Sequence, residues 1–232
     1  MTVSGWDNIV PNNYSLLAVP FYEAIGGIVH DVSKYSNAGT LNNCTWTQLP
    51  SGIWCLSMNG VNDWLDFGNP AILQVLNEYT ILFWANLNSV QASAQFANPL
   101  GKDYSGTQGI TLQIDHTSAN SEYWHIGNGA SLYSINYDIP MANFLDNQWH
   151  LFGVSKGLTH GMSIWRDGFI CGYVPGYTLP TAWGAGNWYY GRCNILVRIT
   201  TMYGGKLYFI NQVLTSIEHL EVFNRERARY GV

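Results

Sequence analysis

Hydrophobic and polar residues alternate along much of this chain, in short segments that turn residues separate. Residues 109–114 and 149–154 alternate clearly, and a period of two places successive side chains on opposite faces of a strand. Residues 79–85 are almost continuously apolar instead, which predicts a strand covered on both faces. Many short strands divided by glycine, asparagine, aspartate and proline favour an all-β sandwich.

Turn dipeptides predict how some of these strands connect. Asn59-Gly60 lies between two alternating segments, residues 56–58 and 64–67, and predicts a hairpin. Asp167-Gly168 predicts a second hairpin in the same way. Residues 44–46 and 53–58 form another predicted strand pair, around a turn at residues 49–52.

One helix is predicted near the C-terminus. Thr215 and Glu218 have the spacing of a capping box, in which a hydroxyl and a carboxylate satisfy free amides of the first turn. Ile217, Leu220 and Phe223 follow at helical spacing, and arginines lie near the chain end, where the helix dipole favours cations. We expect a short helix packed on the edge of the sandwich.

The composition favours one domain with an unusual surface. The chain has 232 residues, of which 47% are hydrophobic, and no linker or repeat divides it, so residues 1–232 are predicted to form one domain with residues 1–15 as an N-terminal extension. Charged residues make up only 11% and aromatic residues 15%. The aromatic rings either fill strand positions in the core or lie on the surface, as sugar-stacking platforms or within a protein interface.

Charge and hydropathy argue against two classes of partner. A formal net charge of −5 does not suit an electrostatic nucleic-acid footprint. No apolar run approaches the length of a membrane span, and no signal peptide follows Met1. We expect neither nucleic-acid binding nor a membrane span.

Four cysteines leave two alternatives open. Cys44 and Cys55 flank the predicted turn at residues 49–52, so a hairpin would bring them nearly opposite each other, and Cys171 and Cys193 would form the second disulfide. Four buried free thiols are the alternative. No Cys-x-x-Cys motif or spaced histidine pair suggests zinc.

A series of short motifs, in the correct order, resembles laminin-G-like and pentraxin-like domains. Residues 58–65 (MNGVNDWL) are similar to that family's F-N-G-x-D-D-Y-V strand pair, and residues 147–150 (NQWH) to its G-Q-W-H. The other matches are residues 31–41, Trp46, and residues 79–84, 100–102, 165–168, 190–191 and 211–218. The resemblance implies a two-sheet antiparallel jelly-roll sandwich of the concanavalin A type, and a binding role.

Family members often carry a structural calcium ion on acidic loop residues. Here residues 203–210 form a shorter segment than the family's and lack its usual aspartate, so no cofactor is expected, and a structural calcium ion is the alternative that the resemblance leaves open. The best polar loop candidates for a metal or ligand are Asp31, Asn37, Asp63 and Asp103. Turns in which the side chain bonds its own backbone are the alternative role for them.

The sequence offers little for catalysis. Asp63 and Asp66 have an odd spacing that would place them on opposite faces of a strand, whereas retaining glycoside hydrolysis needs two neighbouring carboxyl groups. His150 lies in a strand beside Trp149 and is interpreted as a structural histidine. We therefore do not expect an enzyme, and a diverged glycoside hydrolase is the weakest of the functional hypotheses.

The leading hypothesis is a non-catalytic attachment or assembly module on the exterior of a larger particle, such as a virion surface or capsid-decoration protein. Low charge and many aromatic residues suit a surface that a protein partner or a second copy covers, with residues 177–190 and their Trp183 and Trp188 as part of it. The alternative is a lectin-like carbohydrate-binding module. Its predicted stacking residues are Trp124, Trp183, Trp188, Tyr104 and Tyr133.

Overall fold

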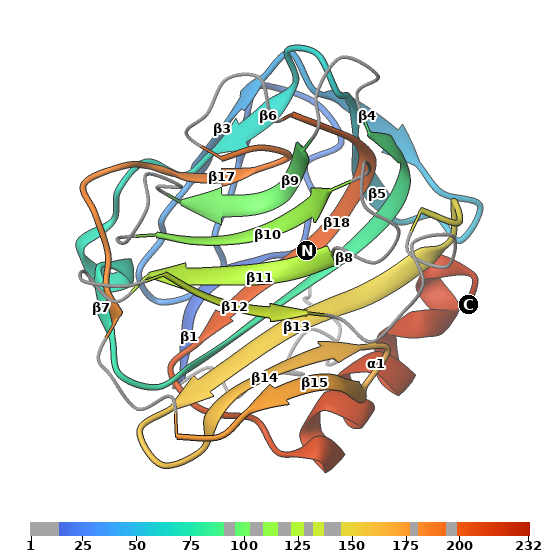
Figure 1. Cartoon of the computed structure of the whole chain (residues 1–232). Helices are drawn as coiled ribbons and strands as arrows, with labels where there is room; N and C mark the ends of the chain where they lie inside the picture. Colours follow the sequence, from blue (N-terminus) through green and yellow to red (C-terminus); the bar gives the residue numbers. More distant parts are fainter. Residues whose placement is uncertain are drawn as a thin grey trace.

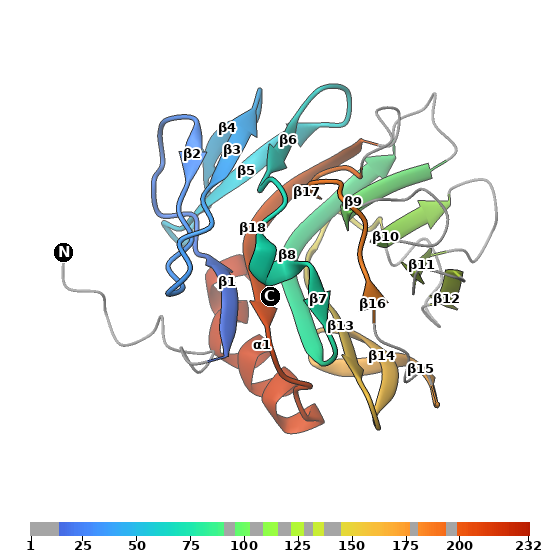
Figure 2. The ribbon, with the colours of Figure 1, turned by 90° about the vertical axis from the view of Figure 1, so that its left-hand side faces the viewer.

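Two antiparallel β-sheets pack face to face, and one helix covers the outer side of one of them (Figures 1 and 2). This computed structural model describes residues 14–90, 96–102, 109–115, 122–127, 132–136, 145–176, 181–193 and 199–232. The predicted all-β architecture with two antiparallel sheets and a C-terminal helix is confirmed. No helix in this described part has the length and apolar character needed to cross a membrane.

The first sheet, sheet A, has β15 at one edge and β4 at the other. Its strands lie in the order β15 (Phe169–Val174), β14 (Gly161–Arg166), β13 (Trp149–Gly157), β8 (Tyr79–Val90), β18 (Thr200–Ile210), β5 (Trp54–Asn59) and β4 (Thr45–Gln48), and β1 (Ser15–Val19) also pairs with β18.

The second sheet, sheet B, has β12 and β2 at its edges. Its order is β12 (Leu132–Asn136), β11 (Glu122–Gly127), β10 (Ile110–Asp115), β9 (Phe96–Lys102), β17 (Trp188–Tyr190), β6 (Trp64–Asp66), β3 (Gly39–Asn42) and β2 (Ile28–Val29). A small separate sheet pairs β7 (Val75–Leu76) with β16 (Thr181–Ala182), and η1 (Ala71–Leu73) is a short 3₁₀ helix.

Strand β8 is covered on both faces, as its apolar run predicts. Ile81 and Phe83 point into the core between the sheets, where Phe83 contacts the rings of Phe152 and Tyr190. Leu82 and Trp84 point the other way, into a second cluster under the helix. The central strand therefore serves two hydrophobic layers.

The helix α1 (Ser216–Tyr230) begins with the predicted capping box. The Glu218 amide donates to Thr215 Oγ1 at 3.3 Å, and the Thr215 amide donates to Glu218 Oε2 at 2.7 Å. The helix ends at Gly231, whose φ of 78° suits a residue without a side chain. Contrary to the expected edge position, α1 lies across the outer face of sheet A, since its Tyr230 stacks on Trp84 of the central strand.

A buried ion pair fixes α1 on the sheet. Glu226 is fully buried and accepts hydrogen bonds from Lys206 Nζ at 2.9 Å, Tyr208 Oη at 2.7 Å and Trp84 Nε1 at 2.6 Å. Sequence patterns do not distinguish this glutamate, because its helical position resembles that of exposed charged neighbours.

The two glycine turns have different outcomes. Asp167-Gly168 does join a hairpin, β14 to β15, and both residues have positive φ, as a type I′ turn requires. The hairpin predicted at Asn59-Gly60 is wrong: β5 belongs to sheet A and β6 to sheet B. Alternation cannot distinguish a hairpin from an arch that crosses the core, because both place apolar side chains of the two strands in one interior.

The predicted disulfides are absent, and all four cysteines are free. Strands β4 and β5 do pair, but the register sets Thr47 opposite Cys55. Cys44 packs against the core between the sheets, and Cys55 belongs to the cluster under α1, so the two thiols lie on opposite sides of sheet A. Cys193 is buried and donates to Asn98 Oδ1 at 3.3 Å in sheet B, whereas Cys171 lies in β15 at the edge of sheet A.

Candidate binding surfaces

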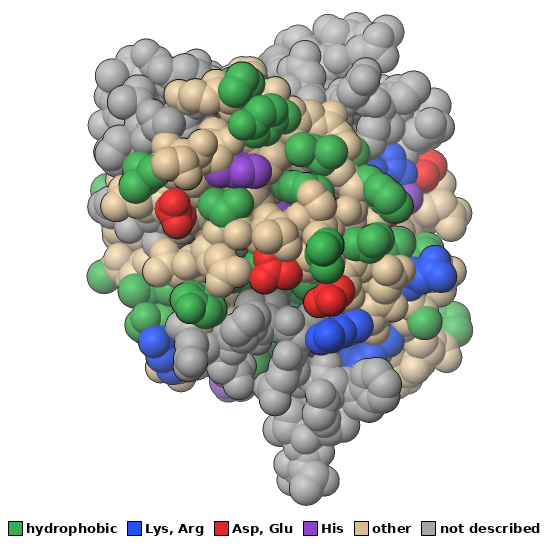
Figure 3. All heavy atoms as spheres, turned by 90° about the horizontal axis from the view of Figure 1, so that it is seen from below, with side chains coloured by type: hydrophobic (Ala, Val, Ile, Leu, Met, Phe, Trp, Pro, Cys, Tyr) green, Lys and Arg blue, Asp and Glu red, His purple; other side chains and the backbone are tan. Residues whose placement is uncertain are grey.

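An exposed apolar surface follows the β15 edge of sheet A. Phe169, Ile170 and Tyr173 of β15 are 63%, 51% and 49% exposed, and Leu158 and Ile217 add exposed apolar side chains from the β13–β14 turn and the first turn of α1. Seen from below, hydrophobic side chains gather around a histidine on this side of the molecule (Figure 3). We call these five residues the β15 surface.

A hollow of about 450 Å³ opens beside β15. Its lining residues are His160, Trp165, Ile170, Tyr173, Val213, Leu214, Thr215 and Ser216. The lining therefore carries no Lys, Arg, Asp or Glu side chain and is mainly apolar.

Hydrogen bonds and stacking hold the walls of this hollow in place. Trp165 Nε1 donates to Ser163 Oγ at 2.9 Å, and Tyr173 Oη donates to the His160 carbonyl at 2.7 Å. The Trp165 ring stacks on His219 of α1 with centroids 3.9 Å apart. Burial, together with a smaller effect of the nearby His160, lowers the pKa of His219 to about 3, so His219 supports the tryptophan as a neutral ring.

A second, polar hollow of about 410 Å³ lies over β3 and β6 of sheet B. Ala38, Thr40, Asn42, Asp66, Phe67, Gly68 and Asn187 line it, and we call it the Asp66 groove. Asp66 Oδ1 accepts a hydrogen bond from the Gly68 amide at 2.7 Å. Asn187 Nδ2 lies 3.0 and 3.1 Å from the two Asp66 oxygens. The carboxylate is therefore held in a fixed orientation at a half-exposed position.

Two aromatic rings lie beside the Asp66 groove. Trp64 precedes Asp66 by two residues in β6, and Tyr189 is the cross-strand partner of Asp66 in β17, so all three side chains share one face of sheet B. The Arg192 guanidinium lies 4.5 Å from the Trp64 ring centroid and 4.6 Å from that of Tyr189. Both rings are half-buried and are positioned by this cation.

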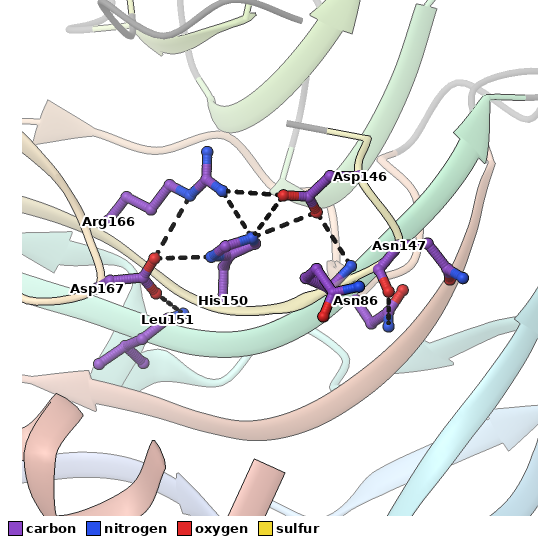
Figure 4. A network of polar contacts seen from close by, with 8 residues as sticks. Asn86, Asp146, Asn147, His150, Leu151, Arg166 and Asp167 are labelled. Carbon is purple, nitrogen blue, oxygen red and sulfur yellow. Dashed lines mark hydrogen bonds and ion pairs between the residues drawn. The ribbon is translucent and has the colours of Figure 1, made fainter. Parts of the chain in front are cut away.

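A network of charged residues surrounds His150 of β13 (Figure 4). His150 Nδ1 lies 2.7 Å from Asp167 Oδ2, and His150 Nε2 lies 3.1 Å from Asp146 Oδ2 and 2.6 Å from an Arg166 terminal nitrogen. Asp167 Oδ1 also accepts from the Leu151 amide at 3.0 Å. The network ties the β14–β15 turn to β13, so the geometry agrees with a structural role for His150.

Two further arrangements bear on catalysis. Ser155 Oγ lies 2.9 Å from His219 Nε2, but both residues are buried between sheet A and α1, where no substrate reaches them. Asp63 is buried, which raises its pKa, and it accepts from the Asn59 amide at 2.9 Å, whereas Asp66 faces the open groove. The two carboxyl groups therefore do not share one exposed cleft.

Three of the five predicted sugar-stacking residues lie in the core. Trp124, Trp183 and Trp188 are at most 8% exposed and belong to the cluster between the sheets, so a stacking or interface role is wrong for these rings. Strand alternation explains the outcome for Trp124 and Trp188, which occupy inward positions. Tyr104 lies outside the described residues, and so does the side chain of Tyr133, whose backbone belongs to β12.

The predicted metal ligands do not form a common site in the described residues. Asp31 is buried and accepts hydrogen bonds from the amides of Ala18, Ser33 and Asn37 at 2.8–2.9 Å, which is the turn role considered as the alternative. No group of three or more acidic, histidine or cysteine side chains in the described part could hold a metal ion. Asp103 lies outside the described residues.

Sequence patterns do not indicate the residues that line the two hollows. Asp66 was considered only as half of an acid pair, and Asn187 is 121 positions away from it along the chain. For β15, a usable signal was present: the segment Phe-Ile-Cys-Gly-Tyr-Val has neither charge nor proline.

No family model and no curated protein matches this sequence. Several solved structures with a similar fold are described as binding domains. The chain is similar to the binding domain of Paraclostridial Mosquitocidal Protein 1, with a TM-score of 0.75 and 10% identity, over 92% of this chain and 52% of that one.

Two botulinum neurotoxin structures are also similar. The binding domain of type DC, solved with rat synaptotagmin II, matches with a TM-score of 0.68 and 12% identity, over 92% of this chain and 52% of that one. A type C structure, whose description states that cell entry depends on interaction with two ganglioside molecules, is similar with a TM-score of 0.71 and 14% identity. The match covers 92% of this chain and 51% of that one. The chain thus spans about half the length of each matched structure and shares the fold of these binding domains.

Proposed function

We propose that this protein is a non-catalytic attachment module that associates with a second copy of itself along β15. The observation that carries the proposal is strand β15 at the centre of the β15 surface: the strand is uncharged, lies at the edge of sheet A and has three large exposed apolar side chains. Edge strands are normally protected by charge, proline or a bulge that turns the edge away, because their backbone can pair with another chain. Strand β15 has neither a charged residue nor a proline, and its one feature of this kind is a register shift at Cys171, where its pairing with β14 is irregular.

The opposite edge of the same sheet supports this reading. Strand β4 has the sequence Thr-Trp-Thr-Gln, with Thr45 and Gln48 exposed. Polar side chains at that edge interact well with water, so β4 needs no partner. The contrast between the two edges favours a protein partner for β15.

A second copy suits β15 because antiparallel pairing of a strand with itself is symmetric. In such a dimer, a two-fold axis between Cys171 and Gly172 sets Ile170 of each copy opposite Tyr173 of the other copy. Both residues line the hollow, so they point to the same side of β15, and aromatic–aliphatic cross-strand pairs stabilise sheets. Two copies with a net charge of −5 each repel over most of their surfaces, and an uncharged patch avoids that repulsion.

Binding domains of this fold include one solved in complex with rat synaptotagmin II, which supports attachment as the role. The proposal places this module on the exterior of a larger particle, such as a virion. Neighbouring subunits of such a particle contact each other through surfaces that have few charges and are largely apolar. Immunogold labelling of purified particles tests the location separately.

Sedimentation velocity tests the association. We expect the wild type to form a dimer, and Ile170→Lys to weaken it by at least 100-fold, because a lysine at the strand centre places charge in the interface. Ile25→Lys is the matched control, since Ile25 is 79% exposed and lies outside sheet A; it should dimerise like the wild type. Amide exchange should slow in β15 alone as protein concentration rises. A wild type that stays monomeric at high concentration, or an Ile170→Lys variant that still dimerises, would contradict the proposal.

A further inference from the structure

We infer that the Asp66 groove is a binding site for a neutral, hydroxyl-rich saccharide. This site lies on sheet B, away from the β15 edge of sheet A, and the inference does not depend on self-association. It rests on three features: the pattern of side chains on the sheet face, the Asp66–Asn187 pair, and the two rings beside it.

The strand register places polar and aromatic groups side by side on one face. Asp66 has Thr40 of β3 opposite it on one side and Tyr189 of β17 on the other. Trp64, two residues away on the same face, has Asn42 opposite it. Directly opposite side chains in antiparallel strands lie about 5 Å apart, which is the scale on which one sugar ring presents its hydroxyl groups.

The Asp66–Asn187 pair has the chemistry to bind adjacent hydroxyl groups. The Asp66 carboxylate can accept about four hydrogen bonds, and the described structure uses those from the Gly68 amide and from Asn187 Nδ2. Spare acceptor capacity therefore remains at a half-exposed carboxylate, next to the exposed hydroxyl of Thr40. Since neighbours already fix the carboxylate, little conformational entropy is lost on binding.

Trp64 and Tyr189 supply the apolar component. A sugar ring has an apolar C–H face as well as hydroxyl groups, and aromatic side chains combine a flat apolar body with a polar tip. Arg192 is 4% exposed, its Nε donates to the Cys193 carbonyl at 2.7 Å, and its guanidinium lies over both rings. This arrangement fixes the two rings beside the carboxylate before any ligand arrives.

Other ligand classes fit less well. A calcium ion needs six to eight oxygen ligands, and the groove has one carboxylate. An anion would be repelled by Asp66, and an apolar ligand would leave Asp66, Asn187 and Thr40 without water or a partner. The hollow of about 410 Å³ lies within the size range of small-molecule sites, which suits a mono- or disaccharide.

Isothermal titration calorimetry with the full chain tests the inference. The probes are lactose, maltose, mannobiose and chitobiose, with sialyllactose and inorganic phosphate as anionic comparators. We expect at least one neutral disaccharide to bind, and Asp66→Asn and Tyr189→Ala each to weaken that binding by at least tenfold. Thr40→Val removes one exposed hydroxyl and is the variant to use if Asp66→Asn does not fold; it should weaken binding by about threefold.

Two controls separate this site from the rest of the molecule. Glu221→Gln removes an exposed carboxylate on α1, and Ile170→Lys alters the β15 surface; both should leave saccharide affinity within twofold of the wild type. The inference is overturned if none of the four disaccharides binds at millimolar concentration, if only the anionic probes bind, or if folded Asp66→Asn and Tyr189→Ala variants bind as tightly as the wild type. Any of these results leaves the association along β15 unaffected.

Discussion

The interior has two layers that differ in chemistry. Between the sheets, most contacts join apolar and aromatic side chains, as where Phe83 packs on Phe152 with centroids 5.4 Å apart, and the buried Lys156 ammonium lies over the Tyr79 ring. Between sheet A and α1, the layer contains the fully buried Glu226–Lys206 ion pair and the buried His219. The first layer depends mainly on non-directional apolar burial, and the second adds directional hydrogen bonds to its own apolar cluster.

This difference has a structural consequence. Apolar packing tolerates exchange of one apolar side chain for another as long as volume is conserved, whereas Glu226 bonds three particular donors from β8 and β18. The polar layer therefore fixes where α1 lies. Through the stack of His219 on Trp165, it also fixes one wall of the hollow beside β15.

Removing the charge at Glu226 should have the largest effect. Glu226→Gln leaves the buried Lys206 ammonium without its counter-charge, and breaking a buried pair costs about 3–5 kcal/mol of unfolding free energy. Urea unfolding measures this loss. The exposed Glu221→Gln variant should change stability by less than about 0.5 kcal/mol. Combining Glu226→Gln with Lys206→Met should recover part of the loss. If Glu226→Gln alone is harmless, the contrast between the layers fails.

Acid should weaken the helix layer through His219. Burial lowers its folded-state pKa to about 3 from an ordinary value of 6.5, so the unfolded chain takes up this proton first. The contribution of neutral His219 is complete above pH 6.5 and is lost as pH falls toward 3, at about 1.4 kcal/mol per pH unit. Urea unfolding at pH 7, 6, 5 and 4 measures the slope. The His219→Gln variant should lower the slope of unfolding free energy against pH by about 1.4 kcal/mol per pH unit. The exposed His30→Gln variant is the control and should leave the slope unchanged. Equal slopes in all three proteins would refute the role of His219.

Loss of the helix cap should have the smallest effect. Thr215→Ala removes the hydroxyl that accepts from the Glu218 amide, and such caps contribute about 1 kcal/mol. Thermal unfolding checks this value, with Ser216→Ala one position later as the control, for which a change below about 0.5 kcal/mol is expected. A Thr215→Ala loss as large as that of Glu226→Gln would mean that the cap, rather than the buried ion pair, anchors α1.

Local sequence signals were reliable where local chemistry decides. The capping box at Thr215 and the hairpin at Asp167-Gly168 both form as predicted, because each depends on residues a few positions apart. The double coverage of β8 also followed from its continuous apolar run. Signals that depend on distant strands failed. The arch at Asn59-Gly60 has the same local pattern as a hairpin, and Gly60 has a positive φ of 74° there too.

The sequence by itself determined the all-β class, the start of α1 and the alternation that fills the core. The tertiary structure decided which tryptophans are buried, which edge of sheet A remains apolar, and that Asp66 meets Asn187 and Tyr189. The physical reason is that alternation gives each strand two faces without saying which partner covers them. Strand order alone places β15 at an edge and β6 between β3 and β17, and both proposed binding surfaces follow from that order.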